Sequence, residues 1–392
     1  MELNHGFHLG YCTNIHPGES WAETLANLEK HTLAVRERIC PGRRYAIGLR
    51  LGEAAARELS QPKTLLEFRH WLDRHDAYVF TINGFPYGRF HGTRVKEQVY
   101  APDWTTSERL DYTIRLFELL AQLVPDGIEG SVSTVPGSFK EFIRTDEQVA
   151  AMRRNLWTCV EQVAALSGRC GRKLHLGLEP EPLCFLETSD EAVRFFDQMR
   201  DDRPCDHRID HHLGVNYDTC HLAVEFEDPA AAINHLRRNG VLLSKVHLSS
   251  ALKLRPTPAA RERLASFADD TYFHQVIVRR EDGRLERIRD LPDALRQGPA
   301  DDSGAGEEWR VHFHIPLHAA PAVPLGGTTD HLLGVLDLLT AEPRLCRHFE
   351  METYTWGVMP AELRQASVVD QLVGEYEWTL ARFAERGIRP AD

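Results

Sequence analysis

Residues 174–182 read LHLGLEPEP, and residues 212–221 read HLGVNYDTCH. Each stretch begins as a short, mostly apolar run and ends in ionisable residues. Short apolar runs bounded by proline or turn residues are typical of strands buried on both faces of a parallel sheet. Ionisable residues at the point where such strands stop predict a site at the carboxyl end of the sheet.

The same pattern recurs along the chain and predicts eight strands. They are Phe7–Thr13, Tyr45–Leu51, Ala77–Ile82, Gly130–Val135, Leu174–Glu179, His212–Tyr217, Leu242–Leu248 and His348–Thr353. Stretches with helical spacing of apolar residues lie between them. These predicted helices are Ser20–Arg38, Thr105–Leu123, Thr188–Met199, Pro229–Arg238, Asp330–Leu339 and Val368–Arg386. Thr105 with Glu108, and Thr188 with Glu191, have the spacing of a capping box.

Strand–helix alternation of this length implies parallel strands joined by crossover helices. Eight such units favour a closed (β/α)8 TIM barrel over an open doubly wound sheet, and no GxGxxG follows an early strand. The whole chain, 1–392, is therefore predicted to be one barrel domain.

One segment, Ala251–Glu308, is too long for a simple loop after the seventh strand. Within it, Phe273–Val278 and Arg284–Ile288 flank Asp282-Gly283, which is a hairpin signal. Residues 298–307 (GPADDSGAGE) have a flexible composition, and Trp309–Leu317 is predicted to be one more strand. We interpret Ala251–Glu308 as an insertion that lies over the mouth of the barrel, as a lid or a wall.

Composition narrows the classes of function. The 392 residues carry a net charge of −12, which disfavours nucleic-acid binding because phosphate backbones are repelled. No stretch reaches the roughly 20 apolar residues that span a bilayer, and nothing near Met1 is typical of a signal peptide. The eight Cys form no CxxC pair, which is typical of reduced thiols in a cytoplasmic protein.

Ionisable residues follow each of the late strands. Glu179 and Glu181 end the fifth, Asp218 the sixth, His247 the seventh, and Glu350 and Glu352 the eighth. In a barrel these positions surround one opening, and a mixed carboxylate and imidazole set suits Mn²⁺, Co²⁺, Zn²⁺ or Mg²⁺. Burying several like charges without a cation would be costly, so the cluster predicts a divalent metal site.

Residues two apart on a strand face the same side, so each acidic pair offers two candidates. We predict Glu179, Asp218, His247 and Glu352 as the metal ligands, with Glu181 and Glu350 as the alternates. His221, three residues past Asp218, is open to three roles: it binds substrate, binds a second metal, or orients Asp218.

Other polar residues are predicted to contact a substrate. They are His16 after the first strand, Lys96 in the long third loop that begins Asn83–Tyr87, and Glu181 and His221. His314 is a further candidate. His312 and His314 lie two apart on the predicted strand, where a structural pair and a contribution to the mouth both stay open.

This ligand set resembles that of the xylose-isomerase-like superfamily, which includes sugar isomerases, ketose 3-epimerases and endonuclease-IV-type enzymes. The resemblance implies metal binding by Glu179, by Asp218 with His221, by His247 and by Glu352. Glu181 stands where xylose isomerases have Lys, which argues against their hydride shift. More closely, STVPGSFK (133–140), LEPEP (178–182), NYDTCH (216–221), HFHIPLH (312–318) and EMETYTW (350–356) are similar to EboE-type metabolite traffic proteins.

The expected activity is isomerisation or epimerisation of a sugar or cyclitol, a polyol-like metabolite. A divalent metal would stabilise an enediolate, while Glu179 and Glu352 remove and return a proton. A non-catalytic carrier barrel for metabolite export and an endonuclease-IV-like phosphodiesterase are the alternatives.

Overall fold

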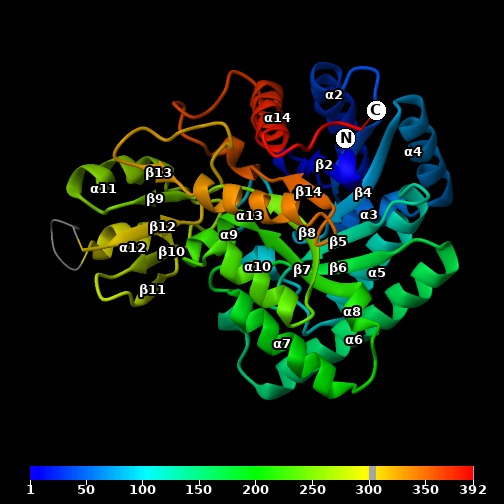
Figure 1. Ribbon diagram of the computed structural model, residues 1–392, viewed down its shortest axis with the longest axis horizontal. Helices are drawn as coiled ribbons and strands as arrows, with labels where there is room; N and C mark the ends of the chain where they lie inside the picture. The colour runs from blue at the N-terminus through cyan, green and yellow to red at the C-terminus, as the bar shows by residue number, and fades with distance from the viewer. Residues whose placement is uncertain (300–305, 392) are drawn as a thin grey trace.

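The computed structural model describes residues 1–299 and 306–391. Eight parallel strands form the centre of the molecule (Figure 1). They are β2 (Phe7–Tyr11), β3 (Tyr45–Arg50), β4 (Ala77–Asn83), β5 (Gly130–Thr134), β6 (Leu174–Leu178), β7 (Leu213–Asp218), β8 (Leu242–Leu248) and β14 (His348–Met351). A short β1 (Glu2–Leu3) joins the edge of β2 in antiparallel fashion. All eight predicted strands are confirmed.

The strands lie in chain order around a nearly closed α/β barrel. Strand β14 pairs in parallel with both β2 and β8, so the last strand returns beside the first. A single bridge between Cys12 and Gly48 then joins β2 to β3 and completes the ring. The carboxyl ends of the eight strands therefore meet at one mouth, as the strand–helix alternation predicted.

Helices surround the strands. They are α1 (Trp21–Asn27), a π-helical turn (Leu28–Thr32), α2 (Leu33–Ile39), α3 (Glu53–Leu59), α4 (Pro62–Arg74), α5 (Ser107–Leu123), α6 (Asp146–Cys170), α7 (Ser189–Asp202), α8 (Ile209–His212), α9 (Thr219–Val224), α10 (Pro229–Arg238), α13 (Thr329–Ala341) and α14 (Val368–Ala384). The six predicted helices are present, although Ser20–Arg38 is divided by the π turn. No helix among the described residues is long and apolar enough to cross a membrane.

The two predicted capping boxes differ from expectation. Thr105 does not cap α5, because its backbone N–H and hydroxyl both donate to Asp103, and the helix begins after Thr106 instead. Thr188 caps α7 by accepting from the Glu191 N–H, but the Glu191 carboxylate accepts from the backbone of Glu187, so only half of that box forms.

A second, five-stranded antiparallel sheet follows β8 and lies beside the mouth (Figure 1). It contains β9 (Leu252–Leu254), β10 (Val276–Arg279), β11 (Leu285–Ile288), β12 (Glu308–Val311) and β13 (Gly326–Gly327), with α11 (Pro258–Leu264) and α12 (Leu291–Gln297). We call these five strands and two helices the inserted sheet. The predicted hairpin is β10 and β11. Part of the predicted flexible stretch, residues 300–305, lies outside the described residues.

The strand predicted at Trp309–Leu317 ends earlier, at Val311. Beyond it the chain leaves the inserted sheet and crosses to the barrel, where the Ile315 N–H donates to the Ser250 carbonyl. Trp309 and Phe313 anchor the crossing in the apolar core of the inserted sheet. The intervening segment therefore lies at the boundary between the two sheets.

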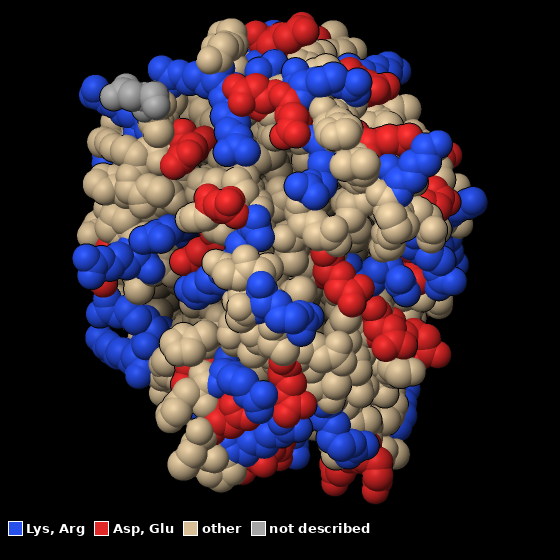
Figure 2. All heavy atoms as spheres, turned by 90° about the vertical axis from the view of Figure 1, so that its right-hand side faces the viewer, with Lys and Arg blue, Asp and Glu red and all other residues tan. Residues whose placement is uncertain are grey.

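The surface carries charges of both signs. Figure 2 shows acidic and basic side chains interspersed on one face of the molecule. A uniformly basic face would be the electrostatic signature of nucleic-acid binding, and this face does not have it.

Candidate metal centre and its pocket

The four predicted ligands converge at the mouth of the barrel. Glu179 directly follows β6, Asp218 ends β7, His247 lies in β8 and Glu352 directly follows β14. All four are buried, and one possible ligand atom from each lies within 4.8 Å of the others. The pairing register explains this, because Asp218 lies opposite His247 on the neighbouring strand.

The His247 ring is surrounded by carboxylates. Its Nδ1 lies 2.9 Å from Glu179 Oε1, 3.0 Å from Glu352 Oε2 and 3.6 Å from Asp218 Oδ2. One ring nitrogen carries at most one proton, so it cannot satisfy three carboxylates. Burial alone would lower the pKa of His247, but Glu352 and Glu179 raise it well above its ordinary value. The cluster thus attracts positive charge at its centre.

Glu350 lies on the far side of the His247 ring. Its Oε2 is 2.9 Å from His247 Nε2 and 2.5 Å from the ammonium of Lys245, which also donates to Ser133. A carboxylate on Nε2 fixes the proton there and leaves the Nδ1 lone pair for the cluster, the arrangement that supports a metal-binding His. Burial alone would raise the pKa of Glu350, but Lys245 and His247 hold it at about 2. Glu350 therefore supports His247 and does not join the four-residue cluster.

The other ligand carboxylates are also held in place. Asp218 caps α9, and its Oδ1 accepts from the N–H groups of Cys220 and His221 and from the Ser249 hydroxyl. Glu352 Oε1 accepts from Asn14 at 2.8 Å and from Asn83 at 3.1 Å. One oxygen of each carboxylate is thereby occupied, which leaves the other oxygen for the cluster.

The residues fit a divalent cation. Glu179 Oε2 and Asp218 Oδ2 are buried and have no hydrogen-bond partner, and unpaired buried carboxylate oxygens are costly unless a cation binds them. Carboxylates and one imidazole form a set that Mn²⁺, Co²⁺, Zn²⁺ and Mg²⁺ all accept.

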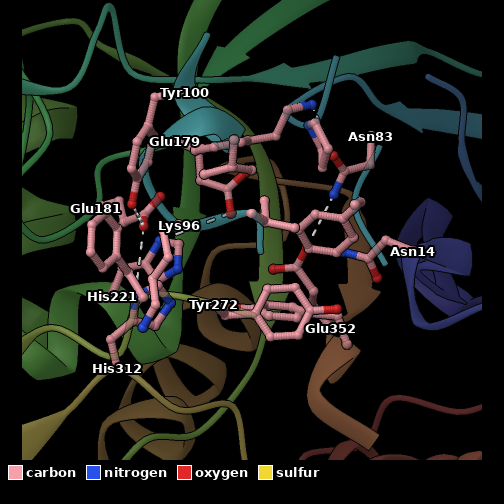
Figure 3. Close-up of a pocket in the computed structure, with 17 residues that line it drawn as sticks. Asn14, Asn83, Lys96, Tyr100, Glu179, Glu181, His221, Tyr272, His312 and Glu352 are labelled. Carbon is pink, nitrogen blue, oxygen red and sulfur yellow. Dashed lines mark hydrogen bonds and ion pairs between the residues drawn. The ribbon is translucent and has the colours of Figure 1, made fainter. Parts of the chain in front are cut away.

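A cavity opens over the cluster and is lined by Glu179, Glu181, His221 and Glu352. Figure 3 shows Glu181, His221 and His312 on one side of it and Asn14, Asn83 and Glu352 on the other. Aromatic rings form much of its wall: Phe85, Phe90, Tyr100, Tyr272, Phe273 and Tyr354. Tyr272 and Phe273 precede β10, and His312 directly follows β12, so the segment that carries the inserted sheet forms a wall of the pocket.

The predicted substrate residues have different surroundings. Glu181 lines the cavity and accepts from Tyr100 at 2.6 Å and from Gln275 at 3.1 Å, and burial raises its pKa to about 7. Lys96 also lines it, but its ammonium is bound by Asp290 at 2.5 Å.

His16 does not lie among the described residues that line the cavity. It is buried, its Nε2 is 2.9 Å from the Tyr11 hydroxyl, and its ring stacks on His31. The contact of His16 with a substrate stays a prediction; its ring packs against Tyr11 and His31, just after the 3-10 turn Thr13–Ile15. The same turn brings Asn14, which the sequence reading missed, to Glu352.

Three imidazoles lie next to the four-residue cluster. His221 projects from α9, while His312 and His314 follow β12. Their rings are in contact, with His314 Nε2 lying 3.2 Å from His312 Nε2 and 3.4 Å from His221 Nε2. His314, predicted to contact substrate, is thus part of a buried histidine cluster together with His221 and His312.

Comparison with known proteins supports the fold. No protein-family model and no curated protein matches the chain. Among solved structures it is similar to an L-ribulose 3-epimerase (12% identity, 99% of this chain and 96% of that chain, TM-score 0.51). It is also similar to an IOLI protein with a zinc atom (14% identity, covering 97% of this chain and 99% of that chain, TM-score 0.51). A third similar structure is that of a xylose isomerase-like TIM barrel protein from Mycobacterium smegmatis in complex with magnesium (14% identity, covering 98% of this chain and 99% of that chain, TM-score 0.51). The chain has a xylose isomerase-like TIM barrel fold.

Proposed function

We propose that this protein is a divalent-metal-dependent isomerase or epimerase of a small hydroxy-carbonyl compound, such as a sugar or a cyclitol. The observation that supports this most is the buried cluster of Glu179, Asp218, His247 and Glu352, in which two carboxylate oxygens have no hydrogen-bond partner. Mn²⁺, Zn²⁺, Co²⁺ or Mg²⁺ is the expected ion. When bound there, it supplies Lewis-acid polarisation of a substrate carbonyl, which acidifies the neighbouring C–H.

The chain supplies the groups that move the proton. Glu179 and Glu352 both line the cavity and come from strands on different sides of the ring, so they approach a substrate from different directions. One carboxylate accepts the proton from the substrate C–H, which leaves an enediolate. The other, which starts in its protonated carboxylic-acid form, gives its proton to the opposite face or to the adjacent carbon, so that the two groups end with their protonation states exchanged. Asn14 and Asn83 hold Glu352 in a fixed orientation for this step.

Other groups bind the substrate and exclude water. The aromatic wall shields the reacting carbon, and a dry site strengthens every charge interaction within it. Glu181, with a pKa of about 7, holds or gives a proton near neutral pH and is placed to interact with a substrate hydroxyl. His221 is a further candidate for substrate contact from the same side.

Exchange of substrate hydrogen with solvent tests the proposal. Protein loaded separately with each of the four metals is incubated in D₂O with a panel of ketoses, aldoses and keto-cyclitols, and loss of the C–H signal is followed by proton NMR. We expect exchange with at least one compound, and a roughly 10²–10⁴-fold slower rate in Glu179→Gln and Glu352→Gln. The surface variant Glu161→Gln is the control. Absence of exchange across the panel in protein that holds metal would remove the catalytic proposal.

A non-catalytic carrier of a metabolite is the second candidate function. It rests on the similarity of STVPGSFK, HFHIPLH and EMETYTW to EboE-type metabolite traffic proteins. For this candidate we propose a cytoplasmic protein in a pathway of metabolite synthesis and export. The paired carboxylates and their orienting donors favour catalysis, because a carrier needs no proton acceptor on two sides. Tight substrate binding without exchange would favour the carrier.

Phosphodiester hydrolysis is less well supported. Lys96 is the single Lys or Arg among the described residues that line the cavity, and Asp290 neutralises it. A phosphate backbone would find little positive charge there, consistent with the net charge of −12. We therefore propose a small-molecule substrate and no nucleic-acid partner.

A further inference from the structure

Helix α9 (Thr219–Val224) connects the candidate metal centre to the inserted sheet. Asp218 caps the helix, and its Oδ1 accepts from the N–H groups of Cys220 and His221 at 2.7 and 3.0 Å. The other oxygen, Oδ2, lies 3.6 Å from His247 Nδ1 in the four-residue cluster. Because Oδ1 is bound to the start of the helix, the direction of Oδ2 depends on the position of α9.

The end of α9 needs support from outside the helix. Six residues are too few for a helix that is stable without tertiary contacts. The Phe226 N–H donates to the Ala223 carbonyl and the Glu227 N–H donates to the Leu222 carbonyl, which are the hydrogen bonds of a Schellman motif. Phe226 consequently lies in the left-handed region, with φ +61°, where glycine is the usual residue. A bulky residue in that conformation is strained, so other contacts must hold it there.

Two arginines of the inserted sheet hold this end. The Arg310 guanidinium donates to the Ala223 carbonyl at 2.6 Å, and its Cζ lies 4.1 Å from the centre of the Phe226 ring. The Arg279 Cζ lies 4.6 Å from the same ring centre. Glu308 accepts from both arginines, at 2.8 and 2.6 Å, and fixes them beside each other. A cation is favourable over an aromatic ring and also beside the carbonyl groups that end a helix, so Arg310 stabilises this end of α9 in two ways.

The inserted sheet contacts α9 at two further points. Ile277 of β10 packs with Cys220 and Val224 in a small buried apolar cluster. Arg287 of β11 donates to the buried carboxylate of Glu225, which is the C-cap residue of α9. Strands β10, β11 and β12 therefore all contact the helix or its cap.

We propose that Arg310 is a positioning residue for the metal centre. By holding the end of α9, it keeps the helix where Asp218 Oδ1 meets the two N–H groups and Oδ2 faces the cluster. Arg310 is not among the described residues that line the cavity, so it acts only through the helix. This inference rests on the metal site of the proposed function and deepens it, because it makes metal affinity depend on the inserted sheet.

Arg310→Met tests the proposal, because it removes the donor and the charge and keeps most of the apolar length. The matched control is Arg284→Met in the same segment, where the side chain is exposed and pairs with Asp282. The first readout is hydrogen–deuterium exchange of the metal-free, full-length proteins. We expect the amides of Cys220 and His221 to exchange about tenfold faster in Arg310→Met, and at the wild-type rate in Arg284→Met.

The second readout is zinc affinity, measured by competition with a chromophoric chelator. It should fall about tenfold in Arg310→Met, stay unchanged in Arg284→Met, and recover in part in Arg310→Lys, which restores the charge and a donor. Exchange throughout β10 in the same experiment shows whether the inserted sheet stays folded. If Arg310→Met unfolds the sheet, Arg310→Gln takes its place, with the same expected and contradicting results.

Two outcomes would overturn the proposal. One is exchange of the Cys220 and His221 amides at the wild-type rate in the Arg310 variant. The other is faster exchange with wild-type zinc affinity, since Arg310 would then stabilise the helix without positioning Asp218. A wild type that binds no zinc would instead refute the proposed function, and exchange of the two amides would still decide whether Arg310 holds the end of the helix that Asp218 caps.

Discussion

Replacement of Glu350 by Gln should weaken metal binding, although Glu350 lies outside the four-residue cluster. Glu350 accepts from His247 Nε2 at 2.9 Å and from Lys245 at 2.5 Å, and neither it nor Lys245 is exposed. The Gln amide no longer fixes the proton on Nε2, so the Nδ1 lone pair is less available to the cation. Loss of such a supporting carboxylate typically lowers metal affinity about 10–100-fold, which is roughly 1.4–2.7 kcal/mol.

The same substitution should also destabilise the metal-free protein. Lys245 would keep a buried charge without its counter-ion, and breaking a fully buried pair from one side costs about 3–5 kcal/mol. Removing the charge as well, in Lys245→Met with Glu350→Gln, should recover most of that stability. The recovery should not extend to metal affinity, because His247 still lacks its carboxylate.

Two assays separate these effects. Competition with a chromophoric chelator gives the zinc affinity, and urea unfolding of the metal-free proteins gives the free energy of unfolding. Zinc binding by Glu350→Gln as tight as that of the wild type would contradict the role given to Glu350. A double variant that is no more stable than Glu350→Gln would contradict the role given to Lys245.

Two further predictions concern other buried groups. In Gly48→Ala the new Cβ would lie 2.0 Å from Glu350 Oε1, so the Glu350 carboxylate must move. Zinc affinity should therefore fall about tenfold, whereas the control Gly88→Ala, whose new Cβ has nothing within 4 Å, should bind zinc normally. Equal zinc affinities of the two variants would contradict this prediction. Burial raises the pKa of Glu375 from 4.5 to about 7, where it accepts from the Thr353 hydroxyl. Because the folded state holds that proton more tightly than the unfolded state, the free energy of unfolding of the wild type should fall by about 3 kcal/mol between pH 4.5 and 7. Urea unfolding of the metal-free proteins should show that Glu375→Gln lacks this fall. A difference in unfolding free energy between the two proteins that does not change with pH would contradict the prediction.

The strands and the positions of the four predicted ligands followed from the sequence because each signal is local. An apolar run predicts a buried strand, and its last residue predicts the rim of the barrel, which placed Asp218 and His247 correctly. The choice between Glu350 and Glu352 is not local. Both side chains face the same side of the strand. Glu350 is the one that pairs with Lys245, because Lys245 lies next to it on the neighbouring strand β8.

The contacts between the inserted sheet and the pocket could not be predicted from the sequence. Tyr272 and Gln275 reach the pocket from more than 90 residues beyond Glu179, and no spacing rule connects positions so far apart. His312 and His314 looked like one face of a strand, but β12 ends before them and their rings turn toward His221. Tertiary packing of the crossing segment decides that geometry.

Anomalous diffraction from crystals of the zinc-loaded protein would show whether a metal binds among the four side chains of the cluster. We expect a peak about 2.0–2.2 Å from His247 Nδ1 and from carboxylate oxygens of Glu179, Asp218 and Glu352. A map without a peak among these four side chains, or with zinc on His247 Nε2 beside Glu350, would contradict it.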